Sequence, residues 1–230
     1  MKLNLLTQNS KIKKSGSNDV AVYNFGIPAF QSKTGERTCP MAGACASGCY
    51  AKSGAYLFSN VAAKFESRFE ATKSNDFDVL IQSDLDLIKS KNRANKKIFI
   101  RIHDSGDFYS ESYLEKWLDI IQANPELSFY AYTKQVSMFK TIKRFLPSNF
   151  DLIFSFGGKQ DHLIDRSTDR HSMVFESNES LMAEGYANAS LEDLTALGVN
   201  HRIGLVFHHA KKFSNTLWNS VLNKQASEAV

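Results

Sequence analysis

The alternation of strand-like and helix-like segments is the feature that most limits the folds open to this chain of 230 residues. Short apolar segments suited to strands recur six times, each followed by helical apolar spacing. The expected strands are residues 19–25, 98–102, 127–132, 151–156, 172–175 and 202–207. The expected helices are residues 59–73, 76–90, 110–123, 137–145, 162–168, 190–197 and 212–225. Such alternation predicts an α/β protein with a parallel sheet and helices packed against it.

The predicted sheet is either a partial barrel or an open doubly wound sheet. No Pro/Gly/Ser-rich linker divides the chain, so we expect a single domain over residues 1–230. Residues 1–18 are expected to form an N-terminal extension, and residues 210–230 to contain a C-terminal helix. In both architectures the functional groups gather at the carboxyl ends of the strands.

Composition narrows the class of protein. An apolar content of 43% and 17 phenylalanines exclude a disordered chain. No apolar run approaches the ~18 residues of a membrane span, and the patch of Leu3, Leu5 and Leu6 is too short for a signal-peptide core. We therefore expect a cytoplasmic protein with no membrane partner. The net charge of +4 neither requires nor excludes a nucleic-acid partner.

All three cysteines of the chain, Cys39, Cys45 and Cys49, lie within eleven residues. Three thiols cannot all pair with one another, so a disulfide framework fits poorly. Their spacing is C-x5-C-x3-C, and small residues and glycines separate them. Such a loop can curl and direct three sulfurs to one side. The pattern indicates a metal or cluster site.

Two metal centres agree with this cysteine loop. Three thiolates suit an iron–sulfur cluster, and in a four-iron cluster they leave one iron without a protein ligand. Zinc binds thiolates too, but a structural zinc takes a fourth ligand. His103, His208 or His209 could supply it. The residues alone leave both alternatives open.

Several segments carry a resemblance to a known family. They are residues 24–29 (NFGIPA), 38–40 (TCP), Cys45, 49–51 (CYA) and 103–108 (HDSGDF). With a cysteine triplet after the first strand, the chain resembles the radical S-adenosylmethionine (radical SAM) enzymes. More specifically, it resembles a phage family of that kind, the gene product eighty-eight family. The similarity runs from about Asn24 to His209.

The resemblance implies a fold and a set of binding residues. The fold is a (β/α)6 partial TIM-like barrel with the cysteine loop after the first strand. Cys39, Cys45 and Cys49 would hold a 4Fe-4S cluster whose open iron binds S-adenosylmethionine. Tyr50 would lie near the adenine. The resemblance also implies polar contacts to S-adenosylmethionine. Its amino group would be bound by Ser105, Gly106 and Asp107, and its ribose or carboxylate by Ser155.

Two departures from the superfamily pattern are present. The usual spacing is C-x3-C-x2-C, and both intervals are longer in this chain. Asp107 stands where a glutamate is usual and is one methylene shorter.

The implied activity is reductive cleavage of S-adenosylmethionine to modify a substrate that the sequence does not identify. An electron donor such as a flavodoxin or ferredoxin would be the partner, in the host cytoplasm for a phage-encoded protein. The alternative is a β/α module that is stabilised by zinc or a cluster and binds a nucleic acid or a host protein without catalysis.

Overall fold

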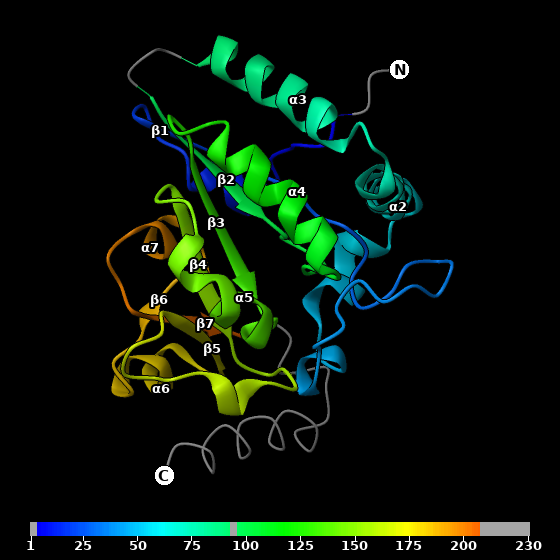
Figure 1. The fold of residues 1–230 in the computed structure, drawn as a ribbon. Coiled ribbons are helices and arrows are strands. Elements are labelled where there is room, and N and C mark those ends of the chain that lie inside the picture. Colours follow the sequence, from blue (N-terminus) through cyan, green and yellow to red (C-terminus); the bar gives the residue numbers. More distant parts are fainter. Residues whose placement is uncertain (1–3, 93–95, 208–230) are drawn as a thin grey trace.

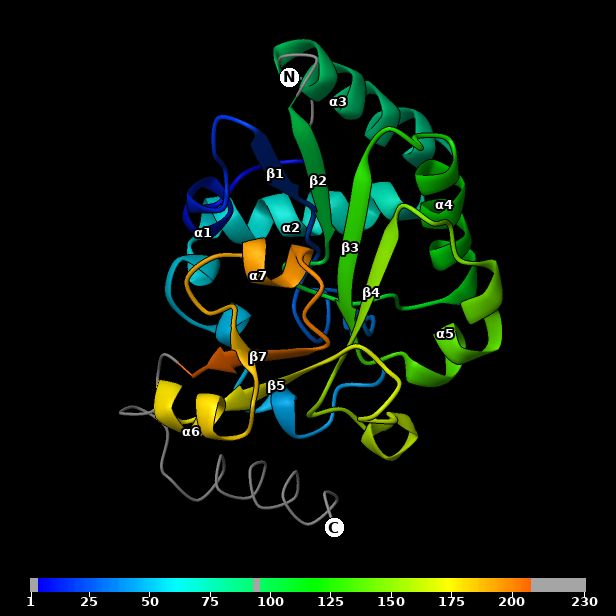
Figure 2. The same cartoon turned by 90° about the vertical axis from the view of Figure 1, so that its left-hand side faces the viewer.

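The described residues of the computed structural model, 4–92 and 96–207, form one curled parallel sheet of seven strands (Figure 1). The strand order is β1-β2-β3-β4-β5-β7-β6, and every neighbouring pair is parallel. The sheet curls into a half barrel (Figure 2). The strands are β1 (Val20–Asn24), β2 (Lys97–Ile102), β3 (Ser128–Thr133), β4 (Phe150–Ser155), β5 (His171–Phe175), β6 (Ala187–Asn188) and β7 (Arg202–Val206).

Helices connect the strands and cover both faces of the sheet. The α-helices are α1 (Ser10–Lys14), α2 (Ser59–Lys73), α3 (Phe77–Lys91), α4 (Glu111–Gln122), α5 (Val136–Ile142), α6 (Asn178–Ala183) and α7 (Leu194–Leu197). Five short 3-10 turns are η1 (Ala44–Ala46), η2 (Tyr50–Lys52), η3 (Gly54–Leu57), η4 (Lys143–Phe145) and η5 (Asp161–Leu163). None of the helices described is both long and apolar enough to cross a membrane.

The outer face of the sheet carries the larger apolar core. Helices α2 to α6 bury their apolar stripes against it, and Trp117 of α4 is fully buried between Phe25 and Phe77. The ring centroids of Phe25 and Trp117 lie 5.2 Å apart in an edge-to-face arrangement. Aromatic pairs of this geometry add stability beyond the area that they bury.

The inner, concave face carries a smaller core. Val22, Tyr130, Ile153 and Ile203 alternate with outward-facing residues along their strands and meet Ile12 of α1. Helix α7 packs on the same face. Residues 1–18, expected as an extension, thus include a helix with a fully buried isoleucine.

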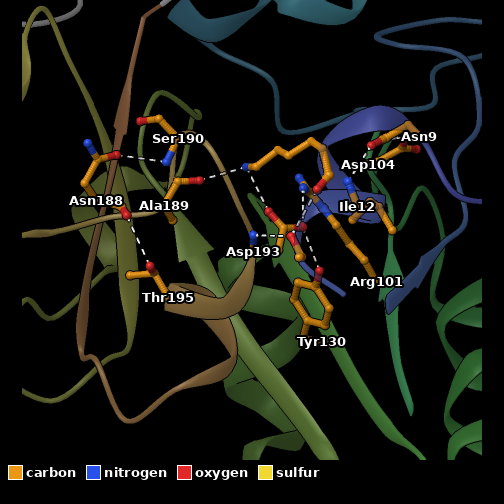
Figure 3. A network of polar contacts seen from close by, with 12 residues as sticks. Asn9, Ile12, Arg101, Asp104, Tyr130, Asn188, Ala189, Ser190, Asp193 and Thr195 are labelled. Carbon is orange, nitrogen blue, oxygen red and sulfur yellow. Dashed lines mark hydrogen bonds and ion pairs between the residues drawn. The ribbon is translucent and has the colours of Figure 1, made fainter. Parts of the chain in front are cut away.

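A buried ion-pair network joins both inner helices to the sheet (Figure 3). Asp193, at the start of α7, has no exposed surface and pairs with Arg101 Nη1 and Lys11 Nζ, each at 2.8 Å. Tyr130 Oη donates to the same carboxylate at 2.7 Å. The Asp193 backbone N–H donates to Ser15 Oγ at 2.7 Å. Burial disfavours the ionised form of Asp193, but the two cations outweigh burial and hold its pKa well below its usual value.

The expected parallel sheet is confirmed, and the six expected strands lie within about two residues of β1 to β5 and β7. The two-residue strand β6 is too short to leave a sequence pattern. The expected helix 162–168 is wrong, because that segment holds only the 3-10 turn η5. The expected helix 190–197 shortens to α7, and α6 was not predicted. The expected helix 212–225 lies outside the described residues.

The chain leaves β2 through two residues with positive φ, His103 (63°) and Gly106 (83°). The left-handed backbone turns the His103 ring away from the inner face, onto Phe108 and Tyr113. Its Nε2 lies 2.9 Å from Tyr113 Oη, and burial lowers the pKa of His103 to about 3. Gly106 lies against Ile27, where a Cβ would come within 2.2 Å of Ile27 Cγ1.

Replacing Gly106 by alanine tests this close approach. We expect Gly106→Ala to lower the free energy of unfolding by at least ~3 kcal/mol, through backbone strain and overlap with Ile27. The matched control is Gly35→Ala, since Gly35 has φ 87° but nothing within 4 Å of its Cβ position. The control should lose only about 1 kcal/mol in denaturant titrations. Equal losses in the two variants would contradict the packing role of Gly106.

The buried His103 should make stability depend on pH. Its pKa is about 3 in the folded chain but ~6.5 when unfolded, so between these values the unfolded state binds the extra proton. Stability contributed by neutral His103 is complete above pH ~6.5 and falls by up to ~1.4 kcal/mol per unit as the pH drops toward 3.

Asparagine at position 103 removes the titration and tolerates positive φ. Denaturant titrations of His103→Asn should therefore show a flatter pH dependence than the parent chain between pH 6.5 and 4. The matched control is the same substitution at the exposed His162. A His103→Asn variant with the parental slope would show that another group governs acid stability.

Candidate functional site

The cysteine loop lies across the carboxyl ends of the strands. The N–H groups of Gly43 and Cys45 donate to Gly157 O, just beyond β4, at 3.2 and 3.1 Å. The N–H of Asp107, beyond β2, donates to Thr38 O at 3.0 Å. These bonds tie one loop to the ends of two strands. Through these contacts the loop and Asp107 lie at the same rim of the sheet.

Close contact with Gly157 and Gly158 explains why small residues separate the cysteines. A Cβ on Gly43 would lie 2.8 Å from the carbonyl carbon of Gly158, and a Cβ on Gly157 would lie 3.2 Å from Cys45 Cβ. Gly157 also has a positive φ of 96°. Side chains at these positions would push the loop off the strand end.

The three thiols are free and partly buried. Cys39 Sγ accepts a hydrogen bond from the Phe30 N–H at 3.3 Å. Burial raises the pKa of Cys39 to about 12, and the charge of Asp107 adds to this effect. Burial also raises the pKa of Cys49, while the cations of Lys52 and Lys134 act in the opposite direction. Burial thus favours the protonated forms of Cys39 and Cys49, and a metal would have to displace their protons.

The donor set has the chemistry of a thiolate-bound metal or cluster, since three soft sulfur ligands share one loop. In the part of the chain that is described, no group of three or more His, Cys, Asp or Glu side chains is arranged around one metal ion. His103, considered as a fourth ligand for zinc, faces the outer core instead. His208 and His209 lie outside the described residues.

Asp107 is buried and engaged within the chain. Its Oδ1 accepts from the Phe108 N–H at 2.8 Å and from Thr133 Oγ1 at 2.6 Å, and its Oδ2 accepts from the Lys134 N–H at 2.9 Å. Burial raises the pKa of Asp107, and these hydrogen bonds partly offset the rise. The carboxylate therefore joins the end of β2 to the end of β3. A carboxylate has about four acceptor positions, so one remains for a ligand.

Ser155 and Lys134 form a second polar group at this rim. Lys134 Nζ donates to Ser155 Oγ at 2.7 Å and to the carbonyls of Ser155 and Phe156 at 3.2 and 3.0 Å. Phe156, whose carbonyl accepts from Lys134, directly precedes Gly157, whose carbonyl binds the cysteine loop, so the expected contact Ser155 lies near that loop. An ammonium with three oxygen partners is held in place and has a fixed orientation.

The remaining expected contacts are distributed around the end of β2. Tyr50 Oη donates to the carbonyl oxygen of Asp104, and its ring packs edge-on against Tyr56 at 5.7 Å. Ser105 is buried, and its carbonyl accepts from the Ile27 N–H at 3.0 Å. Gly106 packs on the same isoleucine. Tyr50 is half-exposed and bridges the cysteine loop to the strand end.

Two cations on the ring of Phe30 were not predicted. Arg37 Cζ and Lys52 Nζ lie 4.0 and 4.3 Å from the ring centroid of Phe30, whose N–H binds the Cys39 sulfur. Cations held on an aromatic ring in this way favour negative charge nearby. No sequence spacing marks the cluster, because Phe30 meets both cations through the fold of the loop.

A family model and individual phage proteins match this chain. The family model described as Gene product 88 matches residues 3–227. The Gene 88 protein of Mycobacterium phage L5 is 30% identical over 135 residues, covering 56% of this chain and 55% of that protein. The Gene 88 protein of Mycobacterium phage D29 is 28% identical over 156 residues, covering 65% and 63%.

The chain thus spans less than two thirds of the length of either phage relative. No solved structure matches it significantly. The resemblance to the phage family is confirmed, whereas the resemblance to radical SAM enzymes stays a prediction. Because the family model covers nearly the whole sequence, the chain belongs to the Gene product 88 family.

Proposed function

We propose that the chain is an iron–sulfur enzyme of the radical SAM kind, built on a (β/α)6 partial barrel. It would hold a 4Fe-4S cluster on Cys39, Cys45 and Cys49 and cleave S-adenosylmethionine reductively to modify a substrate. One observation carries the proposal: the three cysteines of the chain share a loop that is bonded to the carboxyl ends of a curled parallel sheet. Parallel sheets bind their ligands at that edge.

The ligand set agrees with a cluster in three respects. Each thiolate of a four-iron cluster binds a different iron, so the sulfurs need not converge on one point. The Phe30 N–H supplies a hydrogen bond to the Cys39 sulfur, a contact of the kind that tunes cluster potentials. Lys52 and Lys134 act on Cys49 and would offset the negative charge of bound thiolates.

When bound, the cluster and S-adenosylmethionine supply one-electron chemistry that the protein's side chains lack. The chain's own residues would bind, orient and exclude water. Asp107 has one acceptor position left for an ammonium group. Tyr50 offers an aromatic face beside Cys49, and Ser155, fixed by Lys134, offers a hydroxyl for a ribose or carboxylate.

An enzyme of this kind draws electrons from a flavodoxin- or ferredoxin-like donor, which we propose as its partner in the host cytoplasm. The alternative is a β/α module that is stabilised by zinc or a cluster and binds a nucleic acid or a host protein without catalysis. No observation among the described residues favours it over the enzyme. Metal content distinguishes the two directly.

Alanine at any of the three cysteine positions should remove the metal. Anaerobically reconstituted protein should contain roughly four irons and four sulfides per chain, and each single variant should lose most of both. Loss of one thiolate exposes an iron to hydrolysis and oxidation. The matched control is Ser47→Ala, an exposed position in the same loop. Full iron content in all three variants, or colourless protein with one zinc, would refute the cluster.

Removal of the Asp107 carboxylate should weaken S-adenosylmethionine binding to cluster-loaded protein. A carboxylate–ammonium hydrogen bond in a partly enclosed site corresponds to a tenfold to hundredfold change in affinity, within about 1.5–3 kcal/mol. Calorimetry on Asp107→Ala should therefore show a Kd at least ~10-fold higher.

The control for this loss is Thr133→Val. It removes one hydrogen bond that holds Asp107 and lowers stability by ~1–2 kcal/mol, but it keeps the carboxylate. Its affinity should stay within a factor of about three of the parent chain. Equal weakening in both variants would assign Asp107 to loop geometry alone.

A further inference from the structure

The inner face of the sheet changes character along the strands. Its amino-terminal half is apolar and covered by α1 and α7. The same face becomes polar toward the carboxyl ends of β1 to β4, and Ser172 near the start of β5 lies beside the end of β4. The register pairs Asn24 with Arg101 and Ser155 with Ser172. Tyr132 follows Tyr130 by two positions and so lies on the same side.

Four buried polar atoms on this half of the face have no hydrogen-bond partner among the residues described: Asn24 Oδ1, Arg101 Nε, Tyr132 Oη and Ser172 Oγ. Asn24, Arg101 and Ser172 are themselves at least nine-tenths buried. Roughly nine in ten or more buried polar groups in proteins have a hydrogen-bond partner. A buried group without one has lost its hydrogen bonds to water and gained nothing in return. Four such atoms from four strands on one face form a group that needs a partner.

The charges around this group are mainly positive. The Arg101 guanidinium lies 5.1 Å from the centroid of the Tyr132 ring. Lys134 lies just beyond the same strand and binds Ser155. Two carboxylates stand against these cations and Lys11. Asp193 is already paired with Arg101 and Lys11, and burial raises the pKa of the Asp104 carboxyl, which accepts from Asn24 Nδ2.

We propose that the polar half of the inner face binds the anionic group, a carboxylate or a phosphate, of a small molecule. Three groups can donate to it: Arg101 Nε–H, Tyr132 O–H and Ser172 O–H. Asn24 Oδ1 remains to accept from a hydroxyl or amine of the same molecule, since its Nδ2 already donates to Asp104 at 2.6 Å. The site involves none of the three thiols, although Ser155 and Lys134 at its edge are also among the contacts proposed for S-adenosylmethionine.

Unpaired hydroxyls give this site a signature in the free protein. Removing a buried hydroxyl that has no partner relieves a cost, so Tyr132→Phe and Ser172→Ala should raise the unfolding temperature by about 2–4 °C. The matched control is Tyr130→Phe, on the same strand and face. Its hydroxyl binds Asp193, so its removal should lower the unfolding temperature. Lowered temperatures in all three variants would overturn the assignment of unpaired hydroxyls.

Binding is tested on the full chain with inorganic phosphate and with succinate, each against chloride at equal ionic strength. We expect at least one anion to raise the unfolding temperature in a saturable manner. Tyr132→Phe and Ser172→Ala should each raise the apparent Kd for the anion by about tenfold. If the two hydroxyls were merely structural, their removal would not make the protein more stable and weaken anion binding at the same time. Stabilisation by phosphate alone would identify the bound group as a phosphate, and stabilisation by succinate alone would identify it as a carboxylate.

Two results would overturn the proposal. One is the absence of any saturable stabilisation of the parent chain by either anion. The other is stabilisation that Tyr132→Phe and Ser172→Ala leave unchanged, because the anion would then bind elsewhere. Repeating the titration on the Cys39→Ala variant separates this site from the cluster: the phosphate or succinate response should persist when iron is lost.

Discussion

The pairing of Asp193 with Arg101 and Lys11 is the interaction on which the inner half of the molecule depends. A curled parallel sheet must cover its concave face, and among residues 4–92 and 96–207 two short helices, α1 and α7, do so. Five- and four-residue helices bury too little surface to stay in place by apolar packing alone. The carboxylate fixes α7 to β2 and to α1 at once, and breaking a buried pair from one side typically costs ~3–5 kcal/mol.

The same network sets the boundary between the two halves of the inner face. Toward the amino-terminal ends of the strands, the Tyr130 hydroxyl donates a hydrogen bond to the Asp193 carboxylate, and the rest of the inner face is apolar. Toward the carboxyl ends, Tyr132 lies on the same face, but its hydroxyl has no acceptor among the residues described. One side of the Arg101 guanidinium is therefore structural, while its Nε is left unpaired. Arg101 therefore stabilises the fold through its Nη1 and is available to bind the proposed anion through its Nε.

Periodicity predicted most of the sheet, because strands buried on both faces read as near-continuous apolar segments such as IFIRI at 98–102. It failed where elements are short: β6 has two residues and α7 has four, and tertiary contacts rather than local pattern hold them. Cysteine counting identified the loop at the rim. It did not identify Arg101, Tyr132 or Phe30, since inward-facing polar residues inside a strand resemble ordinary alternation until the partners across the sheet are known.

The cysteine loop is ordered differently from what its composition suggests. A loop with so few apolar residues has little side-chain packing to order it, yet Thr38, Gly43 and Cys45 are tied to strand ends by backbone hydrogen bonds. The segment from Cys49 onward is held by other contacts, chiefly Tyr50 on Asp104 and the stacking of Tyr56 on Phe65 at 5.6 Å. Backbone bonds at the glycine contacts need no metal. Coupling between metal binding and folding should therefore concentrate on the cysteine side chains and on residues 46–58, while the two anchor points remain in place.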